Sequence, residues 1–401
     1  MDRAVPSQGG ERSAGGHGQA PEASPCPGAY KGVGALPRTL ELVRDLRGPG
    51  DGSAVLRFVD QSRLPGSLVI GEARRSSEVV EAIMSLSLRG APAIGVAGAA
   101  ALALYAVNES GASDTAGLAA ELEALAPRVA SVRPTAVNLA WGVGRVMAQA
   151  RKAVQDGLAL PLCKQALFDE VKQMEAEDEA TNRRLGQVGA GLIPAGCRVL
   201  THCNAGSLAT VFFGTALGVV YTAAAQGKVE RVFADETRPM GQGARLTVWE
   251  LAQVGIPSTL LCDDMAAVLM AEGKVDAVLV GADRICRNGD VANKVGTYGL
   301  AVAARHHKVP FYVVAPSTSV DATLARGEDV VIEYRPQGEV AHGLPEGVEV
   351  FNPAFDITPH GLITAIVTEC GVFAPSELAA AYGPHEGTSV QGSSQGPYDA
   401  S

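Results

Sequence analysis

The chain has 401 residues, of which 47% are hydrophobic and 19% charged, and its formal net charge at pH 7 is −10. This length favours two domains over one compact core, and the composition is that of a globular protein. The acidic balance disfavours a nucleic-acid-binding surface, although it is compatible with a local basic pocket for a small anion.

The two ends of the chain are poor in large apolar side chains. Residues 1–35 and 383–401 are rich in Gly, Ser and Pro, so they bury too little surface to offset the entropy of ordering and are predicted to be disordered tails. Between them we expect a mainly helical N-terminal domain with a connecting helix, 36–190, and a Rossmann-like α/β catalytic domain, 191–382.

The N-terminal half has mostly helical patterns. A small helix is expected at 39–45, a strand at 54–60, and an amphipathic helix at 76–88. Further helices are expected after Arg89-Gly90, at 115–129, at 135–155 and, long and polar, at 162–185.

The second half alternates short apolar runs with helical patterns. Strands are expected at 198–201, 231–234, 258–261, 277–280 and 311–315, and helices at 207–225, 244–254, 265–272 and 294–305. This alternation is typical of a parallel, doubly wound sheet. The predicted fold class is therefore α/β, a mainly helical N-terminal domain followed by a Rossmann-like doubly wound parallel-sheet C-terminal domain.

Nothing in the sequence favours a membrane or an oxidising environment. Two uncharged runs, 90–108 and 199–227, lack aromatic belts and basic flanks and are interpreted as buried segments, and the N-terminus has no apolar signal region. The seven cysteines are scattered without a CxxC pair, which argues against a disulfide framework and against a zinc site. We expect a soluble protein of the cytoplasm, with the nucleus as a further candidate location.

Polar side chains cluster where the predicted strands end. The strand 198–201 is followed by His202, Cys203 and Asn204, so a thiol stands at its carboxyl end. Ligands bind at this edge of an open α/β sheet. A helix beginning at Ser207 would hold a phosphate or lower the pKa of the cysteine, whereas the simpler interpretation is a buried thiol in a turn.

Similar clusters follow the later strands. Each member alone has an ordinary explanation, and Asp263 or Asp264, for example, is interpreted as a helix cap. Their gathering at one edge of the sheet indicates a site. The clusters are Asp235-Glu236-Thr237-Arg238, Gly241-Gln242-Gly243, Asp263-Asp264, Gly281-Ala282-Asp283-Arg284, Asn293-Lys294 and Ser317-Thr318-Ser319.

Two arginines precede helices in the N-terminal half. In Arg89-Gly90-Ala91-Pro92, the Ala91 N–H and the Arg89 guanidinium can bind an anion, and Arg133 precedes another helix in the same manner. Phosphate capture is one interpretation, and an ordinary loop arginine before a proline is the other. No GxGxxG motif follows the first strand and no Walker A motif is present, so nicotinamide and ATP chemistry are disfavoured.

Six blocks of the sequence together resemble the 5-methylthioribose-1-phosphate isomerases of methionine salvage. Their superfamily also includes ribose-1,5-bisphosphate isomerases and regulatory subunits of the translation initiation guanine-nucleotide exchange complex. The blocks are RGAPAIGVAGA (89–99), RPTAVNLAWG (133–142), THCNAGSLAT (201–210), ETRPMGQGARLT (236–247), GADRICRNGDVANKVGTYGLA (281–301) and NPAFDITP (352–359).

The resemblance implies an aldose–ketose isomerase that converts 5-methylthioribose 1-phosphate to 5-methylthioribulose 1-phosphate. It implies Cys203 and Asp283 as the catalytic pair, a homodimer, and no metal or organic cofactor. Ribose 1,5-bisphosphate isomerisation and a non-catalytic regulatory subunit are the alternatives. The implied substrate contacts are Arg89, Gly90, Ala91, Arg133, Gln242, Asn293 and Lys294.

Overall fold

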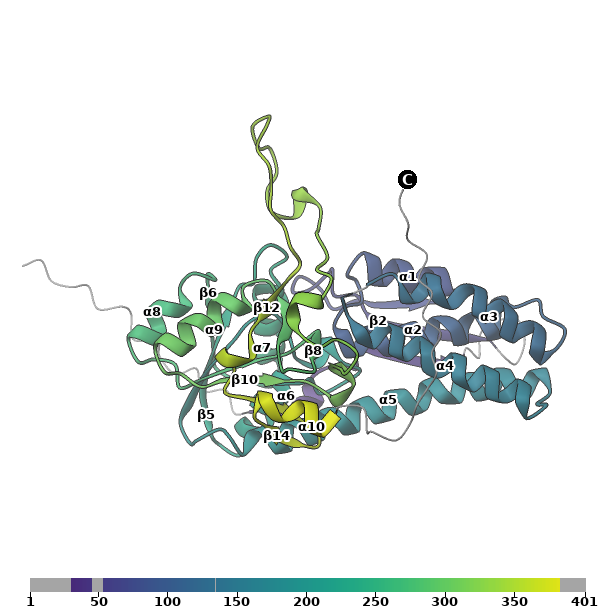
Figure 1. Cartoon of the computed structure of the whole chain (residues 1–401), viewed down its shortest axis with the longest axis horizontal. Coiled ribbons are helices and arrows are strands. Elements are labelled where there is room, and N and C mark those ends of the chain that lie inside the picture. The colour runs from purple at the N-terminus through teal and green to yellow at the C-terminus, as the bar shows by residue number, and fades with distance from the viewer. Residues whose placement is uncertain (1–29, 45–52, 134, 383–401) are drawn as a thin grey trace, which may run out of the picture.

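The computed structural model describes residues 30–44, 53–133 and 135–382, in a helical part and a part built on a parallel sheet (Figure 1). The tails predicted at 1–29 and 383–401 lie outside the described residues. Residues 30–35, which the sequence assigned to the first tail, are placed: Val33–Ala35 forms a short 3-10 turn, and the N–H of Lys31 donates to the carbonyl of Val254 at 2.9 Å.

The N-terminal half contains five helices and a three-stranded antiparallel sheet within the described residues. The helices are α1 (Ser76–Met84), α2 (Ala91–Leu104), α3 (Thr115–Ala130), α4 (Val137–Gln155) and α5 (Leu160–Ala190). The strands are β1 (Leu40–Arg44), β2 (Ala54–Val59) and β3 (Ile70–Ala73), in the order β1-β2-β3. In Figure 1, the long helix α5 runs from this half toward the sheet.

The small helix expected at 39–45 is wrong, because Leu40–Arg44 is the strand β1. Leu40 and Leu42 alternate with more exposed neighbours, and β1 pairs along its whole length with β2, from Leu40 opposite Phe58 to Arg44 opposite Ala54. Pairing with a distant strand overrides the weak local preference of so short a segment.

Helix α2 is the core of the N-terminal half. Nearly all of its side chains are buried, from Ala91 to Leu104, as in a helix that is apolar on every face. By length and composition, Ala91–Glu109 is long and apolar enough to cross a membrane. However, 83% of its apolar 18-residue stretch is buried inside the protein. It is therefore a packed core helix.

The C-terminal half is built on a seven-stranded sheet of order β14-β13-β10-β7-β4-β5-β6, in which only β14 is antiparallel to its neighbour. From β6 to β13 this is the doubly wound order in which the first strand lies beside the fourth. The predicted fold class is confirmed. The strands are β4 (Cys197–Thr201), β5 (Val229–Asp235), β6 (Ser258–Leu261), β7 (Ala277–Val280), β10 (Phe311–Val314), β13 (Ala365–Thr368) and β14 (Gly371–Phe373).

The helices of this half are α6 (Ala216–Ala225), α7 (Val248–Val254), α8 (Ala266–Ala271), α9 (Thr297–His306) and α10 (Leu378–Tyr382). A second sheet, of order β11-β8-β9-β12, was not predicted; its strands are β8 (Arg284–Cys286), β9 (Val291–Lys294), β11 (Val320–Asp321) and β12 (Phe355–Thr358).

Two predicted helices begin later than expected. The helix expected at 207–225 is a 3-10 turn, Ser207–Ala209, then a loop, then α6; the loop contains Phe213 and Gly214, both at φ +82°, which no α-helix contains. The helix expected at 294–305 begins only at Thr297, because Lys294 belongs to β9 and pairs with Phe355 of β12.

The crossing of α2 and α4 supplies a stability test. A Cβ atom on Gly142 would lie 2.0 Å from the carbonyl oxygen of Gly95, whereas one on Gly144, on the same helix, would meet nothing within 4 Å. We expect Gly142→Ala to lower the free energy of unfolding by about 1–3 kcal/mol through overpacking. We expect Gly144→Ala to raise it by about 0.5–1 kcal/mol, because alanine favours the helix. Urea unfolding measures both, and equal midpoints would contradict this packing.

Candidate active site

The two residues predicted to be catalytic follow the two central strands of the sheet. Strands β4 and β7 are neighbours, and Cys203 comes just after β4 while Asp283 comes just after β7. Between these strands the order of the sheet reverses, so their connections leave in opposite directions and open a crevice at the carboxyl edge. The topology therefore places both side chains at one ligand-binding position.

A cavity of about 970 Å³, including the space at its open mouth, occupies this crevice. Both halves of the protein line it, and every residue predicted for the site contributes to its wall. These residues are Arg89, Gly90, Ala91, Arg133, Cys203, Gln242, Asp283, Asn293 and Lys294.

Cys203 is held by its backbone in a left-handed conformation at φ +63°. Its N–H donates to Thr237 Oγ1 at 2.8 Å, and its carbonyl accepts from Thr247 Oγ1 at 2.6 Å. Burial raises the pKa of the Cys203 thiol, and Arg89 and Lys294 only partly offset this. The helix start expected to lower this pKa is absent, since Ser207 begins only a short turn.

Asp283 and Lys294 are brought together by the hairpin of β8 and β9. The Asp283 N–H donates to the carbonyl of Ala292 at 3.0 Å, and Lys294 ends the second strand. Burial raises the pKa of the Asp283 carboxyl, against the lowering effect of Lys294, Arg133 and Arg89. Burial also lowers the pKa of Lys294, whose ammonium donates to the carbonyl of Ala354 at 2.7 Å.

The N-terminal half contributes the start of α2 and Arg89. The Arg89 guanidinium donates to Asn204 Oδ1 at 2.6 Å and to the Asn204 carbonyl at 2.8 Å, joining α2 to the loop after Cys203. Gly90 has φ +102°, and a Cβ there would lie 2.4 Å from the backbone of Ala209. The N-terminus of α2 thus opens into the cavity, where its free N–H groups favour an anion.

The other predicted substrate contacts differ in whether their side chains already have a partner within the protein. Arg133 is paired with Glu333 at 3.1 Å, and Asn293 donates to Thr297 Oγ1 at 3.0 Å. Gln242 is buried, and within the described part of the chain its Oε1 has no hydrogen-bond partner. Its amide is therefore available to a ligand hydroxyl.

Glu250 organises the loop that carries Asn204, a role that no pattern in the sequence indicates. It is fully buried, and its carboxylate accepts from Asn204 Nδ2 at 2.8 Å, from the N–H groups of Ser207 and Leu208 at 2.6 and 3.2 Å, and from the Tyr221 hydroxyl at 2.8 Å. These donors replace hydration of the carboxylate and fix the loop.

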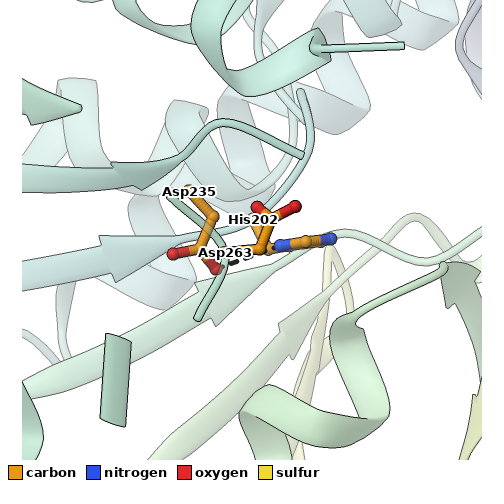
Figure 2. Close-up of side chains that lie close together, drawn as sticks. All are labelled: His202, Asp235 and Asp263. Atoms are coloured by element: carbon orange, nitrogen blue, oxygen red, sulfur yellow. Dashed lines mark hydrogen bonds and ion pairs between the residues drawn. The ribbon is translucent and has the colours of Figure 1, made fainter. Parts of the chain in front are cut away.

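His202, Asp235 and Asp263 come from the carboxyl ends of β4, β5 and β6, and their side chains lie close together (Figure 2). His202 Nδ1 lies 3.0 Å from Asp235 Oδ2. Asp263 is not the helix cap we expected, because its two oxygens accept the N–H groups of Thr237 and Arg238 at 2.7 Å each. It thereby supports the turn whose Thr237 holds Cys203.

Fold and cavity together define an α/β protein with a cavity at the switch point of a doubly wound sheet, lined by cationic side chains and by the start of α2. A profile of the Initiation factor 2 subunit family matches residues 87–375, and the chain belongs to this family.

Several relatives cover most of this chain. The 5-deoxyribose 1-phosphate isomerase of Moorella thermoacetica is 54% identical over 326 residues, which span 80% of this chain and 92% of that protein. The methylthioribose-1-phosphate isomerase of Pelotomaculum thermopropionicum is 50% identical over 83% of this chain and 92% of that protein. The crystal structure of the 5-methylthioribose 1-phosphate isomerase of Pyrococcus horikoshii superposes with a TM-score of 0.76 at 41% identity, covering 86% and 95% of the two chains.

The raised pKa of Asp283 predicts how the stability of the folded protein depends on pH. The folded protein holds this proton more tightly than the unfolded chain, whose Asp pKa is about 3.9. Wild-type stability is therefore lost as the pH rises from about 4 through the folded-state pKa of Asp283. Asp283→Asn carries no such charge, so it should melt about 2–4 °C above wild type at pH 8, with the difference shrinking toward pH 4.

Calorimetry across this pH range measures the effect, with exposed Asp264→Asn as the control that leaves the pH dependence of melting unchanged. A lower melting temperature for Asp283→Asn at pH 8 would show that the neighbouring cations outweigh the burial of Asp283.

Proposed function

We propose that the protein is an aldose–ketose isomerase that converts 5-methylthioribose 1-phosphate to 5-methylthioribulose 1-phosphate. The observation that carries this proposal is the pairing of a half-buried carboxyl and a half-buried thiol at one switch point, within a cavity that also holds cationic groups. Relatives about half identical over four fifths of the chain are named as isomerases of sugar 1-phosphates, which supports the same reaction class.

The phosphate of the substrate would bind at the cationic side of the cavity. Arg89, Lys294 and the N-terminus of α2 supply positive charge and free N–H groups there. Lys294 lies 4.4 Å over the ring of Phe355 and Arg89 is fixed by Asn204, so these cations are held in place before the ligand arrives. Fixed positive charge orients the sugar against the reacting pair.

Asp283 would act as the acid that opens the sugar ring. A phosphate on the anomeric oxygen prevents spontaneous opening to an aldehyde, so the bond between C1 and the ring oxygen breaks only when that oxygen is protonated. Burial raises the pKa of this carboxyl, which favours the protonated form that the step needs. Proton transfer leaves a hydroxyl on C4 and a cationic carbon at C1.

Hydrogen then moves from C2 to C1, and Cys203 stands beside this step. As a base, its sulfur would take the proton from C2 and return it to C1 through an enol; alternatively, the hydrogen moves from C2 to C1 as a hydride. In both routes the C2 hydroxyl gives its proton to the Asp283 carboxylate, which restores the acid and leaves the ketone at C2. Burial raises the pKa of Cys203, which favours a neutral thiol beside a moving hydride over a resting thiolate base.

The apolar wall of the cavity favours a methylthio group over a second phosphate. Leu86, Ile94, Pro239 and Met240 line it. The remaining arginines are already paired, Arg133 with Glu333 and Arg335 with Glu339, so a second phosphate would have to displace carboxylates. A methyl group fits the same wall with less contact, so 5-deoxyribose 1-phosphate should be a weaker substrate by about 10-fold or more.

The decisive experiment incubates the full chain with 5-methylthioribose 1-phosphate, 5-deoxyribose 1-phosphate or ribose 1,5-bisphosphate and follows ketose formation by NMR. We expect kcat/KM to fall in that order. Cys203→Ser and Asp283→Asn should each lower kcat at least about 100-fold while the fold is retained. Binding without turnover of any of the three would favour the regulatory-subunit alternative and contradict the proposal.

Lys294→Ala tests the phosphate site separately from the reacting pair. Loss of one charged contact should raise KM about 10- to 100-fold, because charge-assisted hydrogen bonds are among the stronger ones. Exposed Lys274→Ala is the matched control and should leave KM unchanged. An unchanged KM in Lys294→Ala would remove this residue from the substrate site.

A homodimer and a cytoplasmic or nuclear location, implied by the resemblance, stay predictions. They follow from no contact described above. Sedimentation and cell fractionation would test them.

A further inference from the structure

His202 is a buried titratable residue that the proposed reaction does not use. It is 1% exposed, its side chain contributes to the cavity wall next to Cys203, and both of its ring nitrogens are engaged. Nδ1 faces Asp235 Oδ2 at 3.0 Å, and Nε2 faces the carbonyl oxygen of Val295 at 2.9 Å.

The hydrogen-bond partner of His202 Nε2 shows whether this ring nitrogen carries a proton. A carbonyl oxygen only accepts hydrogen bonds, so Nε2 carries a proton. Nδ1 then either carries a second proton, which makes the ring an imidazolium, or accepts one from a neutral Asp235. Burial raises the pKa of Asp235, which favours the neutral pair. However, Asp235, Asp263 and Asp356 all face the ring, from β5, from the end of β6 and from β12, and three acidic groups around one imidazole favour its cation.

We infer that His202 is a permanent imidazolium and a positioning residue, which fixes the Cys203 loop against the Lys294 segment. The inference rests on the proposed function only for the roles of Cys203 and Lys294. Residue 202 directly precedes the thiol, and its Nε2 binds the carbonyl of the residue that follows Lys294. One ring thus spans the gap between two segments more than ninety residues apart in sequence.

The packing around the ring supports this role. Gly296 has φ +107°, and a Cβ there would lie 2.7 Å from His202 Cε1, so the backbone after Lys294 lies directly against the imidazole. Asp356 accepts the Gly296 N–H at 2.7 Å and holds the same turn from the other side. Burial lowers the pKa of His202, but the hydrogen bond and charge of Asp235, the Val295 carbonyl and the charge of Asp263 together raise it above its ordinary value, which agrees with the geometry.

A metal ion held by His202, Asp235 and Asp263 is the competing explanation. Their ligand atoms lie within 4.8 Å of one another, and Asp235 Oδ1 has no hydrogen-bond partner among the described residues. However, both oxygens of Asp263 already accept backbone N–H groups, and the ring nitrogens are both engaged. An imidazolium at His202 would itself supply the positive charge among these carboxyl groups, so no metal ion is needed there.

The test is the protonation state of His202 in the full chain labelled with ¹⁵N-histidine, followed by NMR from pH 6 to 9. The resonance is assigned by its loss in His202→Gln or, if that variant does not fold, by contacts to Gly296. We expect protons on both ring nitrogens of His202 throughout this range. A neutral ring at pH 7, or one equivalent of bound metal by elemental analysis, would overturn the inference.

Kinetics separates positioning from simple structural support. Removing the anion in Asp235→Asn should let His202 lose its second proton near neutral pH. The ratio of kcat in Asp235→Asn to kcat in wild type should then fall as the pH rises, by about 100-fold once the ring is neutral, because small misplacements of reacting groups cost that much.

The control His306→Gln should keep the wild-type profile. An Asp235→Asn profile parallel to wild type would contradict the positioning role. If the protein isomerises no sugar phosphate, the proposed function fails, and the NMR titration still decides the state of His202.

Discussion

The site depends on one buried carboxylate, that of Glu250. It accepts four hydrogen bonds, from the Asn204 amide, the Tyr221 hydroxyl and the N–H groups of Ser207 and Leu208. A buried carboxylate without such donors would cost several kcal/mol, so the loop must fold around it. The segment after Cys203 consequently bends back instead of continuing as a helix.

That bend joins the two halves of the protein. It presents both oxygens of Asn204 to the Arg89 guanidinium, which precedes the central helix of the N-terminal half. The cavity therefore takes Asp283 and Cys203 from the ends of the parallel strands, and Arg89 and the start of α2 from the helical half. Neither half alone forms the site, since the switch point supplies the crevice and α2 covers it.

The parts of this architecture that follow from local pattern could be predicted from the sequence. Strands Ser258–Leu261 and Ala277–Val280 occur as expected, because short apolar runs between turn residues have few alternatives within a parallel sheet. That Cys203 and Asp283 lie in one cavity could be predicted because polar groups gather where such strands end, and because the surrounding motifs resemble a known family.

Features set by distant contacts could not be predicted in this way. Strand β1 depends on its pairing with β2, and the loop before α6 depends on Glu250, which looks like an ordinary helix residue in sequence. The hairpin that puts Lys294 beside Asp283 could not be predicted either, because its strands are too short to show an alternating pattern of apolar and polar residues. His202 was visible only as a neighbour of Cys203, since its two acceptors come from β5 and from the turn after β9.

The central claim is that burial keeps Asp283 protonated opposite Cys203 in a cationic cavity. The most direct measurement is the infrared difference spectrum between wild type and Asp283→Asn at pH 7, in the carbonyl-stretch region of a protonated carboxyl group. The account predicts a band of a neutral carboxylic acid that disappears in the variant. A difference spectrum with only carboxylate bands would show that Asp283 is ionised, and it would contradict the account.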